Sequence, residues 1–324
     1  MHKISPHKTK QFLIVLLKIS LVVGAFYFIY YKLTRNNQLD FQTFKALLME
    51  NKIFLLKNIL FLSILSGFNW FFEIIKWRGL VSVFKKISFK EAFHQSLGSL
   101  TASILTPNRI GEYGAKAIYY TSEFRRKILL LNFLGNSMQM LVTTIFGLAG
   151  LYFFMTTYSM NIYYYRSVQF AAVLLFMALL IFWGWKNKKV TIKGISIEKV
   201  LRFFKKIPFK HYLFCLMFSS LRYLTFSFQF YVLLCLFGSE TSYLNAMSVI
   251  TSMYLLASVI PSIFIFDVIV KGGVAVYLFS LTGINELTIL SVITCMWLLN
   301  FVIPSVVGSV FVLRFKLPKS VVIS

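Results

Sequence analysis

Long apolar runs separated by short polar connections dominate the chain. Six of them approach or exceed the roughly 20 residues that a helix needs to cross a bilayer, at 12–31, 53–75, 128–157, 167–185, 211–237 and 285–313. Runs of this length predict transmembrane helices. The pattern therefore predicts an all-α polytopic transmembrane bundle, with residues 1–324 forming a single integral membrane domain.

Two further apolar stretches, 91–122 and 243–283, are interrupted by proline and glycine. Inside hydrocarbon a broken helix is tolerated only where protein or water satisfies the freed backbone groups. We interpret both stretches as re-entrant helical hairpins; the alternative is two ordinary short spans in each. The expected breaks are at Pro107, Gly111 and Gly114 in the first stretch, and at Pro261, Gly272 and Gly273 in the second.

Charge sets the expected orientation. Lysine and arginine outnumber acids 34 to 10, for a net charge of +24. In a soluble protein such an excess suggests nucleic acid, but here the basic residues lie between apolar spans, so we expect no nucleic-acid partner. The 76–90 and 186–210 connections are rich in bases, whereas 158–166 and 238–242 are nearly free of charge. The positive-inside rule then places both termini in the cytoplasm.

With that orientation, the two hairpins enter the membrane from opposite sides. Each is flanked by a span on either side, which defines repeat A at about 53–157 and repeat B at about 211–313, with an offset near 155 residues. At this offset Glu112 and Lys116 fall on Asp267 and Lys271. The order is typical of an inverted-topology repeat, whose broken helices meet near the midplane. Coincidence is the alternative, since acid–base pairs four residues apart are common on helices.

Ionisable residues at membrane depth are costly, and each is a candidate for function. A guanidinium can bind a phosphate through two hydrogen bonds, which makes a headgroup site the functional interpretation. The alternative is a set of internal ion pairs that hold the hairpins together. In that case Arg222, near the middle of its span, is the counter-ion of Asp267 in the second hairpin. The candidate residues are Arg109, Glu112, Lys116, Arg222, Asp267 and Lys271.

Three other polar features carry expectations. The 186–210 connection contains an amphipathic stripe, which predicts a cytoplasmic surface helix on anionic lipid or, alternatively, a solvated basic loop; its apolar members are Ile197, Val200, Leu201 and Phe204. Glu73 is expected near the interface, paired with Lys76 or Arg78. Interhelical hydrogen bonds are expected from one face of the 128–157 span, at Asn132, Asn136 and Gln139.

Signals for catalysis are missing from the sequence. The cysteines lie inside apolar stretches and match no disulfide or zinc spacing; they are Cys215, Cys235 and Cys295. We find no nucleotide-binding loop and no pair of carboxylates spaced for acid–base chemistry. We therefore expect no catalytic residue, no metal and no cofactor.

The first broken stretch carries the string Thr106-Pro107-x-Arg109-x-Gly111-Glu112-x-x-x-Lys116. It resembles the lysylphosphatidylglycerol synthase transmembrane region, the flippase-like family of integral membrane proteins, and the resemblance covers roughly residues 10–315. The segment from Ile260 to Gly273 resembles a later element of that family. It departs from the pattern with Asp267 in place of a glutamate and Ile269 in place of a glycine.

The resemblance implies a protein that moves an anionic phospholipid or a polyprenyl-phosphate-linked lipid across the bacterial cytoplasmic membrane. Its partners would be membrane lipids and, in addition, envelope-synthesis enzymes. Relatives fused to a synthase domain also make lysylphosphatidylglycerol, but the longest hydrophilic stretch here is 186–210, so we expect a transporter rather than an enzyme. Two alternatives stay open: a non-catalytic scaffold of an envelope-synthesis complex, and a transferase that uses a polyprenyl donor.

Overall fold

A computed structural model describes residues 41–51, 53, 55–104, 106, 110–158, 191–192, 195–259 and 266–317, together with residues 16, 19, 20, 23 and 27. The side chains of Val259 and of residues 266–271 are not among those described. The predicted span 167–185 and most of 12–31 therefore lie outside the described residues.

The described chain is helical apart from one short hairpin, in which β1 (Thr191–Ile192) pairs antiparallel with β2 (Ile195–Ser196). This confirms the predicted all-α bundle. Its helices are α2 (Phe41–Glu50), α3 (Leu56–Val81), α4 (Phe89–Ser103), α5 (Gly111–Ile118), α6 (Ser122–Thr157), α8 (Ile197–Lys205), α9 (Phe209–Leu236), α10 (Tyr243–Val259), α11 (Phe266–Ser280), α12 (Glu286–Trp297) and α13 (Ile303–Arg314). The π-helical turn η2 (Leu298–Val302) joins the last two into one continuous helix.

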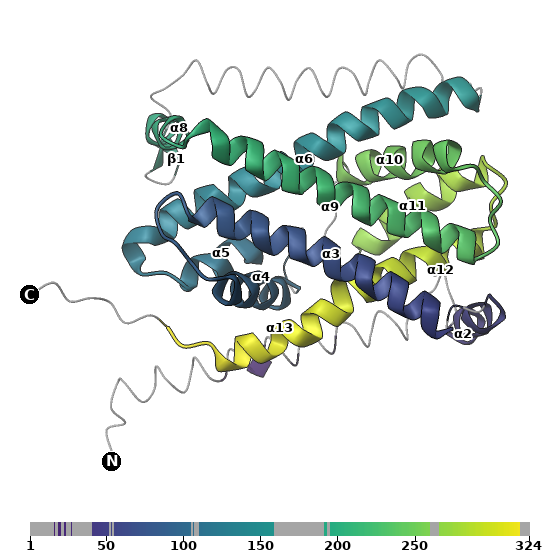
Figure 1. The fold of residues 1–324 in the computed structure, drawn as a ribbon, viewed down its shortest axis with the longest axis horizontal. Coiled ribbons are helices and arrows are strands. Elements are labelled where there is room, and N and C mark those ends of the chain that lie inside the picture. The colour runs from purple at the N-terminus through teal and green to yellow at the C-terminus, as the bar shows by residue number, and fades with distance from the viewer. Residues whose placement is uncertain are drawn as a thin grey trace, which may run out of the picture.

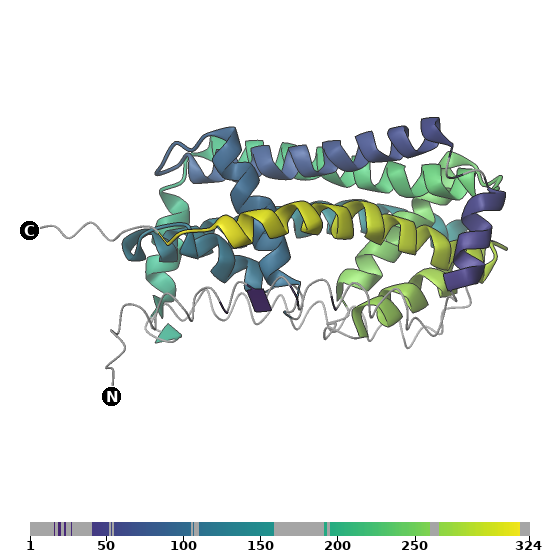
Figure 2. The ribbon, with the colours of Figure 1, turned by 90° about the horizontal axis from the view of Figure 1, so that it is seen from below.

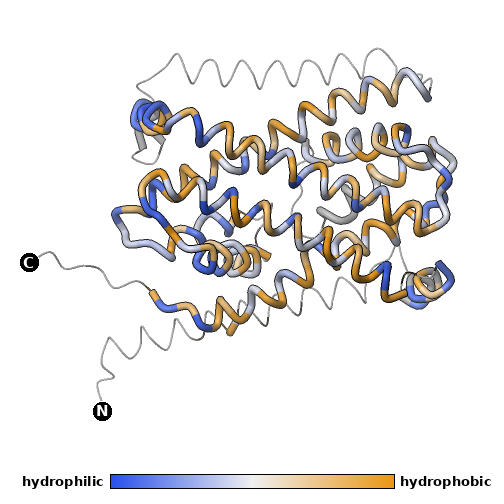
Figure 3. Tube along the Cα trace, viewed as in Figure 1, coloured by the Kyte–Doolittle hydropathy of each residue, from blue (hydrophilic) through white to orange (hydrophobic). Residues whose placement is uncertain are grey.

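Three of the described helices are long and apolar enough to cross a membrane: Leu56–Val81, Ser122–Thr157 and Glu286–Arg314. At 1.5 Å per residue, the 26 residues of α3 extend about 39 Å, which exceeds the roughly 30 Å hydrocarbon core. Apolar residues follow the length of the bundle, and hydrophilic residues gather in the connections at its two ends (Figure 3). The protein is therefore a helical membrane protein.

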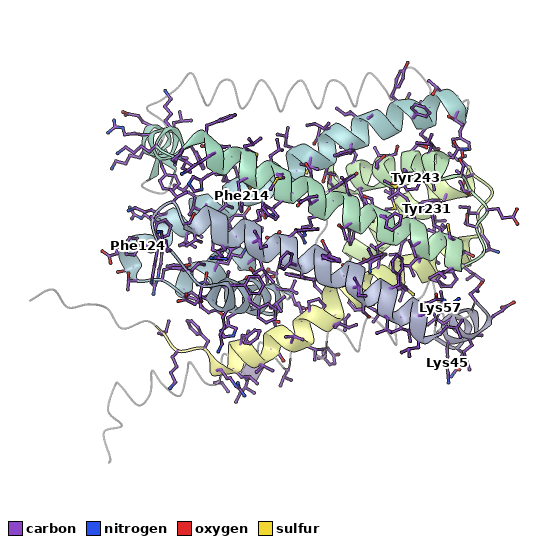
Figure 4. The ribbon with its side chains drawn as sticks, in the orientation of Figure 1. Lys45, Lys57, Phe124, Phe214, Tyr231 and Tyr243 are labelled. Atoms are coloured by element: carbon purple, nitrogen blue, oxygen red, sulfur yellow. The ribbon has the colours of Figure 1, made fainter. Side chains whose placement is uncertain are left out.

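α3 and α9 pack side by side along the length of the bundle and form one of its faces (Figures 1 and 2). The pair α4–α5 lies at one end, near α8, and the pair α10–α11 lies at the other, near α2 and α12 (Figures 1 and 2). Phe124, at the start of α6, and Tyr243, at the start of α10, mark these opposite ends (Figure 4). The two predicted hairpins thus occupy opposite ends of the molecule.

Both ends of the first hairpin meet at the same end of the bundle. Phe84, just before α4, stacks on Phe124, just after α5, with ring centroids 5.4 Å apart. The Tyr120 hydroxyl donates to Gln95 on α4 at 2.8 Å. α4 begins at Ser88 with a capping box, in which the Ser88 side chain accepts from the Glu91 amide and the Glu91 carboxylate accepts from the Ser88 amide. The segment therefore enters and leaves on one side.

The second hairpin has the same form at the other end. α10 begins where Tyr243 contacts Tyr231 on α9, with ring centroids 5.0 Å apart. α11 ends where Phe279 stacks on Phe230, also on α9, at 5.7 Å. Because both ends of this hairpin lie beside one end of α9, the chain returns to the side on which it entered.

The helix bounds follow the predicted offset of about 155 residues. Shifting α3 and α4 by this offset gives 211–236 and 244–258, where α9 and α10 occupy 209–236 and 243–259. The contacts exchange in the same way: α4 packs along α13, and α10 packs along α6. Each half of the bundle thus places the first helix of its hairpin against the last helix of the other half.

Glycines permit these two exchanged contacts. A Cβ at Gly308 on α13 would collide with the carbonyl of Leu97 and the hydroxyl of Thr101 on α4. A Cβ at Gly150 on α6 would collide with the Thr251 hydroxyl on α10. Small residues let the backbones of membrane helices approach closely, so these positions fix how each hairpin sits in the bundle.

Two apolar cores fill the two ends. One is built from α3, α4, α5 and the first half of α6, and the other from the second half of α9 together with α10, α11 and α12. α8 packs at the first of these ends: Phe203 and Phe204 contact that core, whereas Lys199, Arg202 and Lys205 are exposed. The amphipathic helix predicted in the 186–210 connection is therefore present, with its basic face outward.

Candidate functional site

Five charged side chains meet inside the bundle, at the side of α3 that faces α5 and α9. Glu73 on α3 is their centre. Its Oε2 lies 2.7 Å from Lys76 Nζ and 2.8 Å from Arg222 Nη1, and its Oε1 lies 3.9 Å from Lys116 Nζ. Lys116 in turn lies 2.7 Å from Glu112 Oε1, one helical turn away on α5. The cluster is continuous from α9 through α3 to α5.

Lys116 is held on every side by protein. Its side chain is only 1% exposed, and a buried ammonium needs both an opposite charge and hydrogen-bond acceptors. Besides Glu112, its Nζ donates to Asn132 Oδ1 on α6 at 2.9 Å, and it lies 4.3 Å from the centre of the Trp77 ring. Lys116 therefore joins α3, α5 and α6 at one point.

Arg222 occupies the middle of its helix, as residue 14 of the 28 in α9. Its Nε donates to Asn69 Oδ1 at 3.0 Å while Nη1 pairs with Glu73, and its guanidinium carbon lies 5.9 Å from the Trp70 ring centre. Its side chain is 22% exposed, far more than those of Lys76 and Lys116. Arg222 is therefore the cation of this cluster that is accessible from outside the protein interior.

A chain of hydrogen bonds between buried side-chain amides orients Arg222 through Asn69. Asn69 Nδ2 donates to Asn300 Oδ1, and Asn300 Nδ2 donates to Gln229 Oε1, each at 2.8 Å. Trp70 Nε1 donates to the Asn300 carbonyl oxygen at 3.0 Å. Asn300 lies in the π-helical turn η2, a distortion often found at functional sites. The last transmembrane helix is thereby tied, through Asn69, to the guanidinium.

These groups line a small cavity of about 50 Å³. α3, α4, α5, α6 and α9 all contribute to its wall, through Trp70, Glu73, Ser96, Glu112, Asn136 and Arg222. The charged cluster around it holds three cations and two carboxylates among the described side chains, an excess of one positive charge. Such a polar, cationic cavity in an apolar bundle suits an anionic group. No group of three His, Cys, Asp or Glu residues in the described part of the chain is arranged to hold a metal ion.

The structure brings together three of the residues proposed from the sequence, Glu112, Lys116 and Arg222. Arg109, Pro107 and Pro261 lie outside the described residues, as do the side chains of Asp267 and Lys271. The break in the first hairpin lies before Gly111, where α5 begins. Gly114 lies within α5, and Gly272 and Gly273 lie within α11, so the helices run through these three glycines instead of breaking at them.

Sequence reasoning misplaced Glu73, the centre of the cluster. It does pair with Lys76, as expected, but it is only 6% exposed and lies eight residues before the end of α3. The expectation was wrong because the span was ended at residue 75, whereas α3 continues to Val81. A helical stripe of polar residues on this span was the available signal, since Ser66, Asn69, Glu73 and Lys76 follow one another at intervals of three and four and all are buried.

The three amides expected to bond between helices all do so. Asn132 accepts from Lys116, Asn136 donates to the Tyr113 hydroxyl at 3.0 Å, and Gln139 donates to the Ser219 carbonyl on α9 at 3.4 Å. α6 is therefore fastened along one face to α5 and then to α9. This confirms the interpretation of that face as a hydrogen-bonding surface.

A helical bundle with membrane-spanning helices that buries ion pairs and a cationic cavity defines a polytopic membrane protein with a polar interior site. The model of one family, the lysylphosphatidylglycerol synthase TM region, matches residues 15–308. The chain belongs to this family, as the motif around Glu112 and Lys116 indicated. No curated protein matches the chain.

Proposed function

We propose that the protein translocates an anionic lipid, a phospholipid or a polyprenyl-phosphate-linked lipid, across the bacterial cytoplasmic membrane. The observation that carries this proposal is Arg222. It places a partly exposed guanidinium at the middle of a long helix, on a cavity whose charged wall has an excess of positive charge. Membership of a family of membrane regions concerned with lipids supports the choice of a lipid as the ligand.

The geometry explains why Arg222 suits a phosphate. Nε and Nη1 are occupied by Asn69 and Glu73, and these two partners fix the plane of the guanidinium. Nη2 carries two further N–H donors, and a rigid guanidinium loses little entropy when it binds an oxyanion. Lys76 and Lys116 hold Glu73 in place. Glu73 therefore remains as a counter-charge to the cations of the site, and the headgroup is not their only anion.

In this proposal the two halves of the bundle, repeat A at about 53–157 and repeat B at about 211–313, form an inverted repeat. The matched helix bounds and the exchanged packing of α4 on α13 and α10 on α6 support it. Inverted repeats permit alternating access, in which one hairpin and then the other opens the central site. The basic connections then lie in the cytoplasm, together with both termini.

The test is headgroup translocation in proteoliposomes. Phosphatidylglycerol with a fluorophore on its acyl chain is reconstituted with the protein, and a membrane-impermeant reductant reports how fast the lipid reaches the outer leaflet. Arg222→Gln removes the positive charge while Glu73 keeps Lys76 at 2.7 Å, so the fold is expected to survive. A hydrogen bond to a charged group contributes about 1.5–3 kcal/mol, so we expect a loss of about tenfold to a hundredfold in rate.

The matched control is Arg202→Gln, which removes an arginine that is 66% exposed on α8 and pairs with Glu198 there. It should leave the rate unchanged. Equal rates for wild type and Arg222→Gln would refute Arg222 as the headgroup site. If the wild-type protein moved no lipid, while neutral variants at every buried charge still complemented a deletion strain, the scaffold alternative would replace the translocase.

A further inference from the structure

A second face of α9 carries polar groups that the ion-pair cluster does not use. Ser219, Tyr223 and Ser227 follow one another at intervals of four residues, so they lie on one side of the helix. All three are at most 4% exposed. Their hydroxyl oxygens make no hydrogen bond within 3.5 Å in the described part of the protein, although Tyr223 lies beside Ser227 and Ser219 lies beside Cys215.

Two neighbouring helices add groups of the same kind. Gln139 on α6 donates its amide to the Ser219 carbonyl, but its Oε1 is buried without a partner among the described residues. The hydroxyl of Tyr254 on α10 is also buried and unpartnered there. The Tyr223 ring contacts both elements, stacking on Phe146 of α6 at 5.2 Å and meeting Tyr254 edge-on at 6.1 Å. We call these five residues, Gln139, Ser219, Tyr223, Ser227 and Tyr254, the hydroxyl strip.

The hydroxyl strip begins at the cavity. Asn136, which lines the cavity, lies one helical turn before Gln139 on α6, and Arg222, which also lines it, precedes Tyr223 directly. From Ser219 to Ser227 the strip follows α9 for about 12 Å, at 1.5 Å per residue. It ends at Tyr254 on α10, so it runs from the central cavity to the first helix of the second hairpin.

Five unpartnered polar groups in one place are costly. Leaving a buried donor or acceptor unsatisfied destabilises the folded state, and native proteins hold few such groups. Buried waters that make two to four hydrogen bonds commonly satisfy them. Water and hydroxyl groups each donate and accept, so a file of them can pass a proton along: each oxygen receives one proton and releases another, and every group ends unchanged.

We propose that the hydroxyl strip holds a file of internal waters that conducts protons between the central cavity and α10, and that this file couples lipid movement to a proton gradient. The coupling rests on the proposed lipid translocation, whereas the hydration does not. The free energy of moving one charge across a membrane depends on the membrane potential. A proton that travels with an anionic headgroup makes the movement electrically neutral.

The cavity supplies a reason for the proton and the headgroup to bind together. Glu73 faces Lys76, Lys116 and Arg222, and Glu112 faces Lys116. Nearby cations hold a carboxylate in its charged form. An anionic headgroup that binds Arg222 offsets part of this positive field, and so makes protonation of a cavity carboxylate easier. Binding of the lipid and of the proton is then mutually favourable, as linkage requires.

The first test concerns hydration and needs no transport. Hydroxyl radicals generated by X-rays label side chains that touch bound water. When the protein is in H₂¹⁸O, the label carries ¹⁸O and is detected by mass spectrometry. We expect Tyr223 and Tyr254 to be labelled despite their burial. Phe230, which is 2% exposed and packs against Tyr254, should remain unlabelled. If the two tyrosines were labelled no faster than Phe230, the water file would be refuted.

The second test concerns coupling. Proteoliposomes that enclose a pH-sensitive dye receive phosphatidylglycerol in one leaflet, and lipid movement and internal pH are followed together. The variant Tyr223→Phe/Tyr254→Phe keeps both rings and removes both hydroxyls. It should lose the lipid-dependent pH change and the acceleration by a pH gradient, and keep lipid equilibration without a gradient. The control is Tyr231→Phe/Tyr243→Phe, the other contacting tyrosine pair between α9 and α10.

The outcomes separate the two proposals. Wild-type lipid movement that ignores the pH gradient would refute the coupling and leave the translocase intact. Loss of coupling in the control pair as well as in the test pair would also refute the role of the hydroxyl strip. A wild-type protein that moves no lipid would remove the translocase and the coupling together, while the labelling experiment still decides whether the water file exists.

Discussion

Removing the charge of Glu73 should destabilise the protein more than any other single loss of charge in the ion-pair cluster. Among the described residues, Glu73 is the only acid that pairs with Lys76, whose side chain is 2% exposed. Glu73→Gln therefore leaves an unpaired ammonium in the interior. Breaking a buried pair by removing one partner costs about 3–5 kcal/mol. Because Arg222 is partly exposed and can be hydrated, we expect a loss near the lower end, about 3 kcal/mol.

The measurement is reversible unfolding in mixed micelles, with added sodium dodecyl sulfate as denaturant and tryptophan fluorescence as the signal. Trp70 and Trp77 lie beside the cluster and report on it directly. The matched control is Glu240→Gln, the same change at an exposed position between α9 and α10. A surface substitution of this kind should alter stability by no more than about 0.5 kcal/mol.

A double variant tests the physical reason. If the cost comes from the orphaned ammonium, then Glu73→Gln/Lys76→Met should be more stable than Glu73→Gln alone, since it removes the unpaired charge and keeps the volume of the side chain. The reasoning would be refuted if Glu73→Gln unfolded at the same concentration of sodium dodecyl sulfate as the wild type. It would also fail if Lys76→Met added a further cost to the first change instead of relieving it.

Three further predictions use other parts of the structure. Gly308→Ala should cost about 1–3 kcal/mol of unfolding free energy, because its Cβ collides with α4. Gly67→Ala, which meets nothing within 4 Å, should cost nothing, and equal effects would contradict the close contact. The capping hydrogen bonds from Ser88 lower the pKa of Glu91, so this stabilisation is complete above about pH 4.3 and is lost as the pH falls through the lower folded pKa. Glu91→Gln should therefore weaken the acid limb of the stability profile below about pH 4.3, and an unchanged limb would argue against the capping box. The orientation can be tested with single cysteines at the exposed positions Ser122 and Ser242 in a cysteine-free background. An impermeant maleimide should label the cysteine at 122 only from the cytoplasm and the cysteine at 242 only from outside. Labelling of both from one side would contradict the proposed orientation.

Much of the helical architecture was readable from the sequence, because a bilayer makes demands that local composition must meet. A spanning helix must be long and apolar, which is why the predicted span 285–313 agrees within one residue with the helix Glu286–Arg314. The hairpin helices α4 and α10 were also predictable. Proline and glycine near the middle of an apolar stretch free backbone groups that hydrocarbon cannot satisfy, so they indicate a helix that is interrupted inside the protein.

Predictions about individual glycines were less successful. Gly272 and Gly273 lie in the interior of α11, although glycine pairs are weak helix formers. Tertiary packing overrides an unfavourable helix propensity of about 1 kcal/mol per residue, and that packing cannot be read from the sequence. The break before α5 shows the opposite case, since Gly111 donates its amide to the Thr106 hydroxyl and begins the helix there.

The composition of the ion-pair cluster was decided by tertiary structure alone. The sequence identified Glu112, Lys116 and Arg222 because each is a charge within an apolar stretch, and a single charge there is visible without any knowledge of its partner. It did not identify Glu73 as the group that joins them, since pairing depends on how α3, α5 and α9 lie against one another. Residues 149 positions apart, such as Arg222 and Glu73, meet at 2.8 Å only because the two long helices pack side by side. The sequence shows that a charge lies within an apolar stretch, whereas only the packing of the helices decides which residue pairs with it.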